Sequence, residues 1–150
     1  MRLEATLAVA LASLCAGPAH ACWQEVGQKY GIHPYLLYAI AKTESGLNPR
    51  ALNRNTNGSR DLGLMQINSS WLPKLAKYGI TEEQLYEPCV NLEVGAWILA
   101  DNMRRLGTTW SAVGAYNAVS PHKQLAYAMK VYRNLQPAMQ QAAQENDDAN

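Results

Sequence analysis

Apolar side chains recur every three or four residues along most of this chain, a period that predicts amphipathic helices. Leu37 and Ile40 share a helix face with Glu44, because residues spaced at this period point the same way. Pro34 opens this helix at a position where its missing N–H costs nothing, and Gly46 ends it. The pattern therefore places a carboxyl group on the apolar side of a helix, close to the helix end.

The same period predicts further helices on both sides of this one. Their expected ranges are 23–30, 69–78 (capped by Asn68 or Ser69), 88–106, 110–118 and 121–135. Thr81 and Gln84 form a capping-box pattern that adds one short helical turn. Residues 136–150 contain mainly Gln, Ala, Asn and Asp, and we interpret them as a frayed, flexible tail. The tryptophans are assigned to the core rather than to sugar binding: Trp23, Trp71, Trp97 and Trp110.

The segment that follows the Glu44 helix, residues 53–68, is polar and rich in turn-forming residues. Asn57 and Gly58 form the strongest short-range signal for a hairpin turn, and residues 62–67 are expected around the return strand. The chain is therefore predicted to be a mostly helical α+β domain with one small β-hairpin element. A cleft between the hairpin and the helices is the natural place for a substrate.

The first 21 residues resemble a secretory signal peptide. Arg2 supplies a weak positive start, residues 7–14 are apolar, and Ala19, His20 and Ala21 form an A-x-A cleavage site. The apolar stretch is far shorter than the ~20 residues that a membrane span needs, and a buried N-terminal helix is the alternative. We therefore expect export to the periplasm with cleavage after Ala21, a folded domain over residues 22–135, and the tail beyond it.

Cysteine usage agrees with export. Cleavage after Ala21 removes Cys15 and leaves the pair Cys22 and Cys89, which we expect to form a disulfide in an oxidising compartment. That bond would close a loop of about 67 residues, for which the chain-entropy model gives roughly 4 kcal/mol. Two free, buried thiols, or a lipid anchor on Cys22, are the alternatives.

Composition excludes several classes of function. The chain has 150 residues and a formal net charge of +1, which suits a single domain and lacks the basic excess of a nucleic-acid binder. Its three histidines are scattered, no Cys/His cluster has zinc-ligand spacing, and there is neither a glycine-rich phosphate loop nor a G-x-S-x-G motif. We therefore predict no metal, no cofactor and no nucleic-acid partner.

Two carboxylates in opposite surroundings carry the candidate chemistry. Apolar helix neighbours and the negative end of the helix dipole should both raise the pKa of Glu44, which would suit a general acid. Asp61 lies in the polar segment beside Arg60, where it should be ionised and could act as a nucleophile or stabilise an oxocarbenium ion. The alternatives are a partly exposed glutamate at a helix end and a turn aspartate that bonds its own backbone.

Three ordered motifs then resemble a known family. They are Glu44-Ser45, the run Gly63-Leu64-Met65-Gln66-Ile67-Asn68, and Ala115-Tyr116-Asn117-Ala118. Together they resemble the soluble lytic transglycosylases (glycoside hydrolase family 23) over roughly residues 22–135, most of all the small members that accompany secretion, conjugation and pilus systems. The resemblance implies a lysozyme-like fold and cleavage between N-acetylmuramic acid and N-acetylglucosamine. It also implies a 1,6-anhydro product, because no water is used.

The resemblance also implies roles for individual residues. Glu44 would be the single acid/base, and Ser45 and Tyr116 would orient it by hydrogen bonding. Residues expected to contact saccharide are Met65, Gln66, Asn68 and Asn117. Met65 could instead belong to the core, and Tyr116 could be a buried aromatic with a satisfied hydroxyl.

Two departures from the family pattern matter. Val119 replaces the glycine that usually follows the third motif, which suggests a reshaped loop near the saccharide. The segment from Glu44 to Asp61 also resembles the animal c-type lysozymes, in which two carboxylates hydrolyse the bond. From the three motifs together, the chain is expected to be a lytic transglycosylase that opens the wall for a type III or type IV secretion, conjugation or pilus system. A hydrolytic muramidase and a non-catalytic glycan-binding module are the alternatives.

Overall fold

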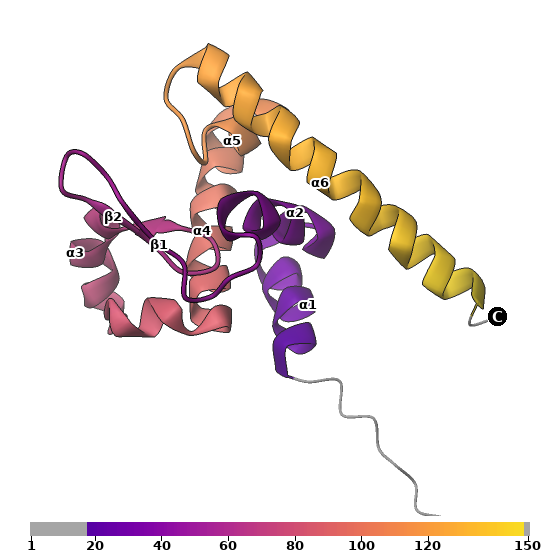
Figure 1. The fold of residues 1–150 in the computed structure, drawn as a ribbon, viewed down its shortest axis with the longest axis horizontal. Coiled ribbons are helices and arrows are strands. Elements are labelled where there is room, and N and C mark those ends of the chain that lie inside the picture. The colour runs from indigo at the N-terminus through magenta and orange to yellow at the C-terminus, as the bar shows by residue number, and fades with distance from the viewer. Residues whose placement is uncertain (1–17, 149–150) are drawn as a thin grey trace, which may run out of the picture.

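The computed structural model describes residues 18–148, so most of the predicted signal peptide lies outside the described residues. The helices that carry the fold are drawn in Figure 1. They are α1 (Pro18–Tyr30), α2 (Pro34–Ser45), α3 (Leu72–Leu75), α4 (Pro88–Leu106), α5 (Trp110–Gly114) and α6 (Pro121–Asp148), with short 3-10 turns at Ser69–Trp71, Ala76–Tyr78 and Glu83–Tyr86. The predicted helix boundaries at Pro34, Pro88 and Leu106 are confirmed. The predicted helix over 69–78 is a chain of shorter turns.

A small antiparallel sheet follows α2. Its strands are β1 (Leu52–Arg54), β2 (Arg60–Leu62) and β3 (Ile67–Asn68), in the order β1-β2-β3. The predicted hairpin is confirmed, although its return strand begins earlier than expected, at Arg60. The register places Asp61 between Asn53 on one side and Asn68 on the other.

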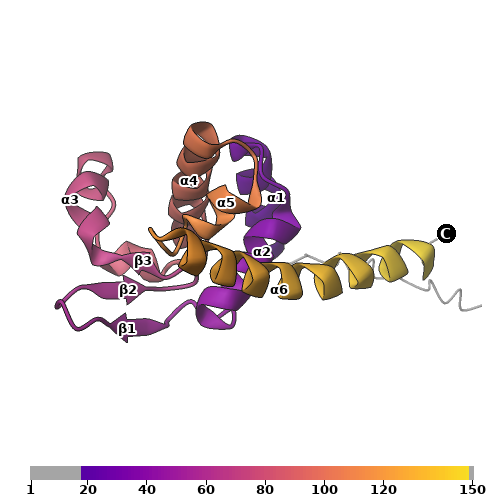
Figure 2. The ribbon, with the colours of Figure 1, turned by 90° about the horizontal axis from the view of Figure 1, so that it is seen from above.

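The core is helical. Leu37 and Ile40 of α2 are fully buried, as the periodicity predicted. Leu92 and Leu99 of α4 are fully buried as well. In Figure 2, α4 lies between α3 and α1 while α6 crosses over α2. The mostly helical α+β fold class is therefore confirmed. Three of the tryptophans pack against the core, but Trp110 is 44% exposed, so the prediction for that residue is wrong.

Two helix ends differ from the sequence prediction. α5 ends at Gly114, and the chain then turns over residues 115–117, so the predicted helix does not reach residue 118. α6 continues past residue 135 to Asp148, with Pro137 inside it. Gln, Ala and Glu favour helix, and this tendency outweighs the backbone hydrogen bond that Pro137 removes. The interpretation of residues 136–148 as a frayed segment is therefore wrong.

The predicted disulfide is present. Cys22 of α1 and Cys89 of α4 are bonded, with their Cα atoms 5.8 Å apart. The bond joins the first helix to the start of the central one, so it braces two elements that also pack against each other. Among the described helices, none is both long and apolar enough to cross a membrane.

Candidate active site

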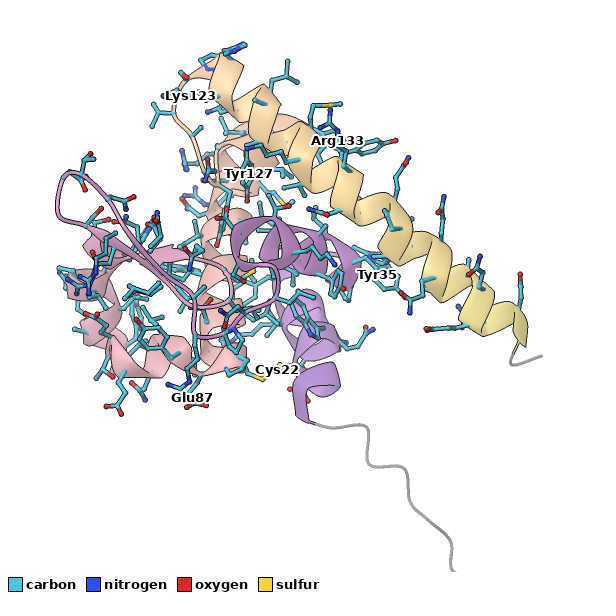
Figure 3. All side chains as sticks on the ribbon, in the orientation of Figure 1. Cys22, Tyr35, Glu87, Lys123, Tyr127 and Arg133 are labelled. Carbon is cyan, nitrogen blue, oxygen red and sulfur yellow. A yellow bond between two sulfur atoms is a disulfide. The ribbon has the colours of Figure 1, made fainter. Side chains whose placement is uncertain are left out.

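Glu44 lies in the last turn of α2, and the helix ends directly after it. Gly46 adopts a left-handed backbone conformation (φ 62°) and donates its N–H to the carbonyls of Ala41 and Lys42. Glycine reaches this conformation without a steric penalty, which makes it the usual residue at such a helix end. The Glu44 carboxyl is held from the neighbouring helix α6, where the Tyr127 hydroxyl donates a hydrogen bond of 2.5 Å to its Oε1 atom. Figure 3 shows Tyr127 on the side of α6 that faces the domain.

Burial raises the pKa of Glu44 from 4.5 to about 7. Hydrogen bonds from Tyr127 and Asn117 and the charge of Lys130 pull the pKa down, while the negative charge of Asp61 pushes it up. Burial and the Glu44 carboxylate also raise the pKa of Tyr127, so its hydroxyl keeps its proton and remains a donor. Glu44 can therefore be protonated or ionised near neutral pH, as the apolar helix face predicted.

Asp61 occupies the opposite kind of environment. Its Oδ2 atom accepts hydrogen bonds from the side chains of Asn53 (3.3 Å) and Asn55 (3.0 Å), and its Oδ1 atom accepts one from Asn68 (2.7 Å). The neighbouring Arg60 pairs with Glu82 instead. Three amide donors thus hold both oxygens of this carboxylate in place. The alternative of a turn aspartate that bonds its own backbone is wrong, because Asp61 lies on β2 and accepts from side-chain amides on β1, on β3 and in the turn between β1 and β2.

The turn that follows β2 is tied to the end of α2. Ser45 donates its hydroxyl to the carbonyl of Leu64 (2.7 Å), and Tyr116 donates to the carbonyl of Met65 (2.9 Å). The prediction that Ser45 and Tyr116 hydrogen-bond Glu44 is therefore wrong for this structure. Both hydroxyls fix the backbone of the Gly63–Asn68 motif, and Tyr127 takes the role that had been assigned to Tyr116.

Asn91 of α4 also holds this turn, through hydrogen bonds to its backbone. Its side chain is fully buried, accepts from the Met65 N–H (2.6 Å), and donates to the carbonyls of Leu62 (2.8 Å) and Leu85 (2.7 Å). A Cβ atom at Gly63 would lie 2.4 Å from the Asn91 amide, so glycine is required for this close approach. The buried amide satisfies three backbone groups at once.

The predicted saccharide contacts divide into three kinds. Met65 is fully buried and packs against Gly95, so the alternative of a core residue is confirmed and contact with saccharide is wrong for this conformation. Gln66 donates to the carbonyls of Gly63 and Ala51 and thereby closes the motif turn, and Asn68 belongs to the Asp61 network. Asn117 is exposed at the site and bonds Glu44. For the amides, contact with saccharide stays a prediction.

Sequence reasoning missed Tyr127 and Asn91. Tyr127 lies on the buried face of α6 together with Ala128 and Val131, and a tyrosine on such a face needs a partner for its hydroxyl. That signal was readable, although its partner was not. Asn91 breaks the apolar face of α4 with a polar residue, which is also a signal of a buried hydrogen-bond role.

The loop after the third motif accommodates Val119 without strain. Among the described residues, Leu47 and Gln66 are the non-glycine positions with positive φ, so Val119 has an ordinary backbone. Its side chain is 95% exposed, and Gln124 holds the loop by donating to the carbonyls of Ala118 and Val119. The glycine of the family pattern is not needed for this loop path.

Two grooves lie away from the carboxylates. The larger, about 470 Å³, lies between the end of α1 and α4 and is lined by Tyr30, Glu93 and Trp97 among others. The smaller, about 280 Å³, lies beside α6. Neither is lined by Glu44 or Asp61. Over residues 18–148, no group of His, Cys, Asp and Glu side chains is arranged to hold a metal ion.

Comparison with known proteins identifies the family of this chain. The family described as "Transglycosylase SLT domain" matches residues 21–134. The chain belongs to this family. Invasion protein IagB of Salmonella typhi is 44% identical over 131 residues, covering 84% of this chain and 82% of IagB. Protein IpgF of Shigella flexneri is 42% identical over 130 residues, covering 83% and 86%.

A solved structure shows the same fold. It is an inactive mutant of the lytic transglycosylase Slt from Pseudomonas aeruginosa, with a TM-score of 0.63 and 22% identity. The match covers 77% of this chain and 23% of Slt. At this identity the likeness concerns the fold, which is the lysozyme-like arrangement that the motifs implied. This SLT-family chain is accordingly an enzyme that cleaves peptidoglycan, of the lytic transglycosylase class.

Proposed function

We propose that this SLT-family enzyme cleaves the β-1,4 bond between N-acetylmuramic acid and N-acetylglucosamine without water, and leaves a 1,6-anhydro ring on the muramic acid. Protonated Glu44 gives its proton to the glycosidic oxygen as the bond to C1 breaks. The resulting carboxylate then takes the proton of the C6 hydroxyl as that oxygen bonds to C1. The proton thus returns to Glu44, and the enzyme ends in its starting state.

One observation carries this proposal. A single group that acts first as an acid and then as a base works best with a pKa near the working pH. The pKa of Glu44, about 7, meets this requirement, and burial is its main cause. In this scheme Asp61 lowers the energy of the positive charge that develops at C1, from a position fixed by its three asparagines.

Hydrolysis is the second candidate, and Asp61 is the observation that favours it. Lysozyme pairs a carboxylic acid in apolar surroundings with a hydrogen-bonded aspartate in polar surroundings, and that aspartate attacks or stabilises C1. Asp61 is close enough for its charge to raise the pKa of Glu44. In that scheme water attacks in the second step, and the product has an ordinary reducing end.

The deciding experiment is mass spectrometry of the products released from purified peptidoglycan. Anhydro-muropeptides are expected, and reducing-end muropeptides would replace the proposal with hydrolysis. Glu44→Gln is the negative control, and Glu83→Gln on the exposed 3-10 turn is the matched variant that should leave the products unchanged. A folded enzyme that binds peptidoglycan and releases no products would support a glycan-binding module instead.

We further propose that the enzyme is exported to the periplasm and opens the wall for a type III or type IV secretion, conjugation or pilus apparatus. The signal-like N-terminus, the Cys22–Cys89 disulfide and the similarity to a protein named for invasion support this. N-terminal sequencing of protein recovered from the periplasm should begin at Cys22. A mature chain that begins at Met1 would overturn the export route.

A further inference from the structure

α6 carries a row of side chains that the domain leaves partly exposed. Leu125 is 64% exposed, Met129 45%, Tyr132 40% and Met139 52%. Gln136 and Ala143 are also exposed and continue the same row. The spacing alternates between four and three residues along the whole row, which is the seven-residue pattern by which one helix packs against another.

This row is separate from the face that α6 buries in its own domain. Tyr127, Ala128 and Val131 fill the buried face, and Tyr127 reaches the active site from it. Figure 2 shows the C-terminal half of α6 extending beyond the other helices. The exposed row therefore runs from the domain onto a part of α6 that stands clear of the domain.

Aromatic and apolar side chains beside the row widen it into a binding surface. Trp110 packs edge-on against Tyr132, with ring centroids 5.5 Å apart, and is itself 44% exposed. The groove of about 280 Å³ beside α6 includes Trp110, Leu135 and Met139 in its lining. Exposed tryptophan and methionine at the edge of an apolar groove are typical of protein interfaces.

The charges of α6 are divided between its two halves. Residues 121–144 contain Lys123, Lys130 and Arg133 and no acidic residue, whereas residues 145–148 contain Glu145, Asp147 and Asp148. A helix with this asymmetry is complementary to a second copy that runs in the opposite direction. In a parallel pair the like-charged ends would lie together, which is unfavourable.

We propose that the exposed row of α6 binds the same row of a second copy of this chain, antiparallel, with the two-fold axis at Gln136. This axis sets Tyr132 opposite the partner's Met139 and Met129 opposite the partner's Ala143. The basic first half of α6 then runs alongside the acidic end of the partner helix. The Gln136 amide lies at the centre. One of its N–H groups donates to the Tyr132 hydroxyl of the same helix (2.7 Å), and its second N–H and its carbonyl can pair with the same groups of the partner's Gln136. A polar residue in a helix–helix seam fixes the alignment of the pair.

Antiparallel pairing leaves both active sites open, because Tyr127 and the exposed row lie on different sides of α6. The pair therefore carries two active sites. The inference is independent of the products that Glu44 generates, so the product analysis and the assembly test can fail separately.

Sedimentation velocity of the full chain over a wide concentration range measures the pairing. A monomer–dimer equilibrium is expected, and it should weaken as salt screens the end charges. Met139→Asp places a charge in the seam and should weaken dimerisation at least tenfold. Gln144→Asp puts the same charge on another exposed part of α6 and should change dimerisation little. Monomers at all concentrations, or equal effects of the two variants, would overturn the proposal.

Cysteine cross-linking tests the direction of the pair, in a chain that also carries Cys15→Ser. Gln136→Cys should form a disulfide-linked dimer with itself. Met129→Cys should not cross-link alone but should do so when mixed with Ala143→Cys. Self-cross-linking of Met129→Cys as efficient as that of Gln136→Cys would indicate parallel pairing and overturn the antiparallel arrangement. Peptidoglycan cleavage by Met139→Asp should equal that of the unaltered chain, which shows that the variant is folded.

Discussion

Glu44 and Asp61 are the same kind of group held in opposite ways. The Glu44 carboxyl is buried where α2 packs against α6, and its hydrogen-bond donors include the Tyr127 hydroxyl and the Asn117 amide. Asp61 lies on a polar sheet and accepts from the amides of three asparagines. Burial raises the pKa of Glu44 by more than the Tyr127 and Asn117 hydrogen bonds and the Lys130 charge lower it, whereas Asp61 is held in place by three amide donors. The environment, rather than the residue type, divides the work between the two carboxyl groups.

The largest expected effect on cleavage comes from changing Glu44. Glu44→Gln keeps the size of the side chain but cannot give up or take a proton, so cleavage should fall by about 10³-fold or more. Release of soluble muropeptides measures it, with circular dichroism to show an intact fold. Retention of more than a tenth of the activity would remove Glu44 from the acid/base role.

The same substitution should stabilise the fold at alkaline pH. The folded pKa of Glu44 (about 7) lies above its ordinary value of 4.5, so its contribution to stability is complete below 4.5 and is lost as the pH rises through 7. The loss amounts to up to about 3 kcal/mol. Thermal unfolding of Glu44→Gln and the unaltered enzyme should therefore coincide near pH 4 and differ in favour of Glu44→Gln near pH 8. Parallel curves at both pH values would contradict the buried environment of Glu44.

Asp61→Asn removes the negative charge of the second carboxyl group and so tests what that charge contributes to the reaction. A transglycosylase should lose about tenfold in rate, because the substrate and Glu44 still perform the bond changes. A muramidase should lose nearly all activity. Asp147→Asn, at an exposed position of α6, is the matched control. The pKa of Glu44 should also fall, because the Asp61 charge raises it. The alkaline limb of the pH–activity profile should therefore move to lower pH.

Tyr127→Phe gives the smallest effect on rate, a loss of about threefold to tenfold. The hydrogen bond from Tyr127 lowers the pKa of Glu44, so its removal should move the alkaline limb of the pH profile to higher pH. Tyr116→Phe is the comparison, because that hydroxyl bonds the Met65 carbonyl and should affect stability more than the pH profile. The assignment of Tyr127 would be wrong if both variants shifted the profile equally.

The boundaries of α2 and α4 and the apolar position of Glu44 were predictable from the sequence. Proline and glycine mark helix ends through local geometry, and the helical period reveals a buried face without knowledge of its neighbours. The α2 prediction succeeded for this reason. The prediction for residues 136–148 failed because polar composition was given more weight than the helix-forming tendency of Gln and Ala.

The partners of the site residues could not be predicted in this way. The family resemblance implied that Tyr116 bonds Glu44, but the tyrosine that bonds Glu44 is Tyr127, 83 positions away along the chain. A hydrogen bond between such distant residues depends on how α6 crosses α2, and local pattern carries no information about that crossing.

By itself, the sequence determined that an acidic residue would be buried at a helix end and that a polar hairpin would follow it, because both features follow from local spacing and turn chemistry. Only the tertiary structure decided that Ser45 and Tyr116 would hold the backbone of the motif turn and that three asparagines would surround Asp61. The physical reason is that a hydrogen bond is directional and short, so it forms only when packing has brought both groups within about 3 Å.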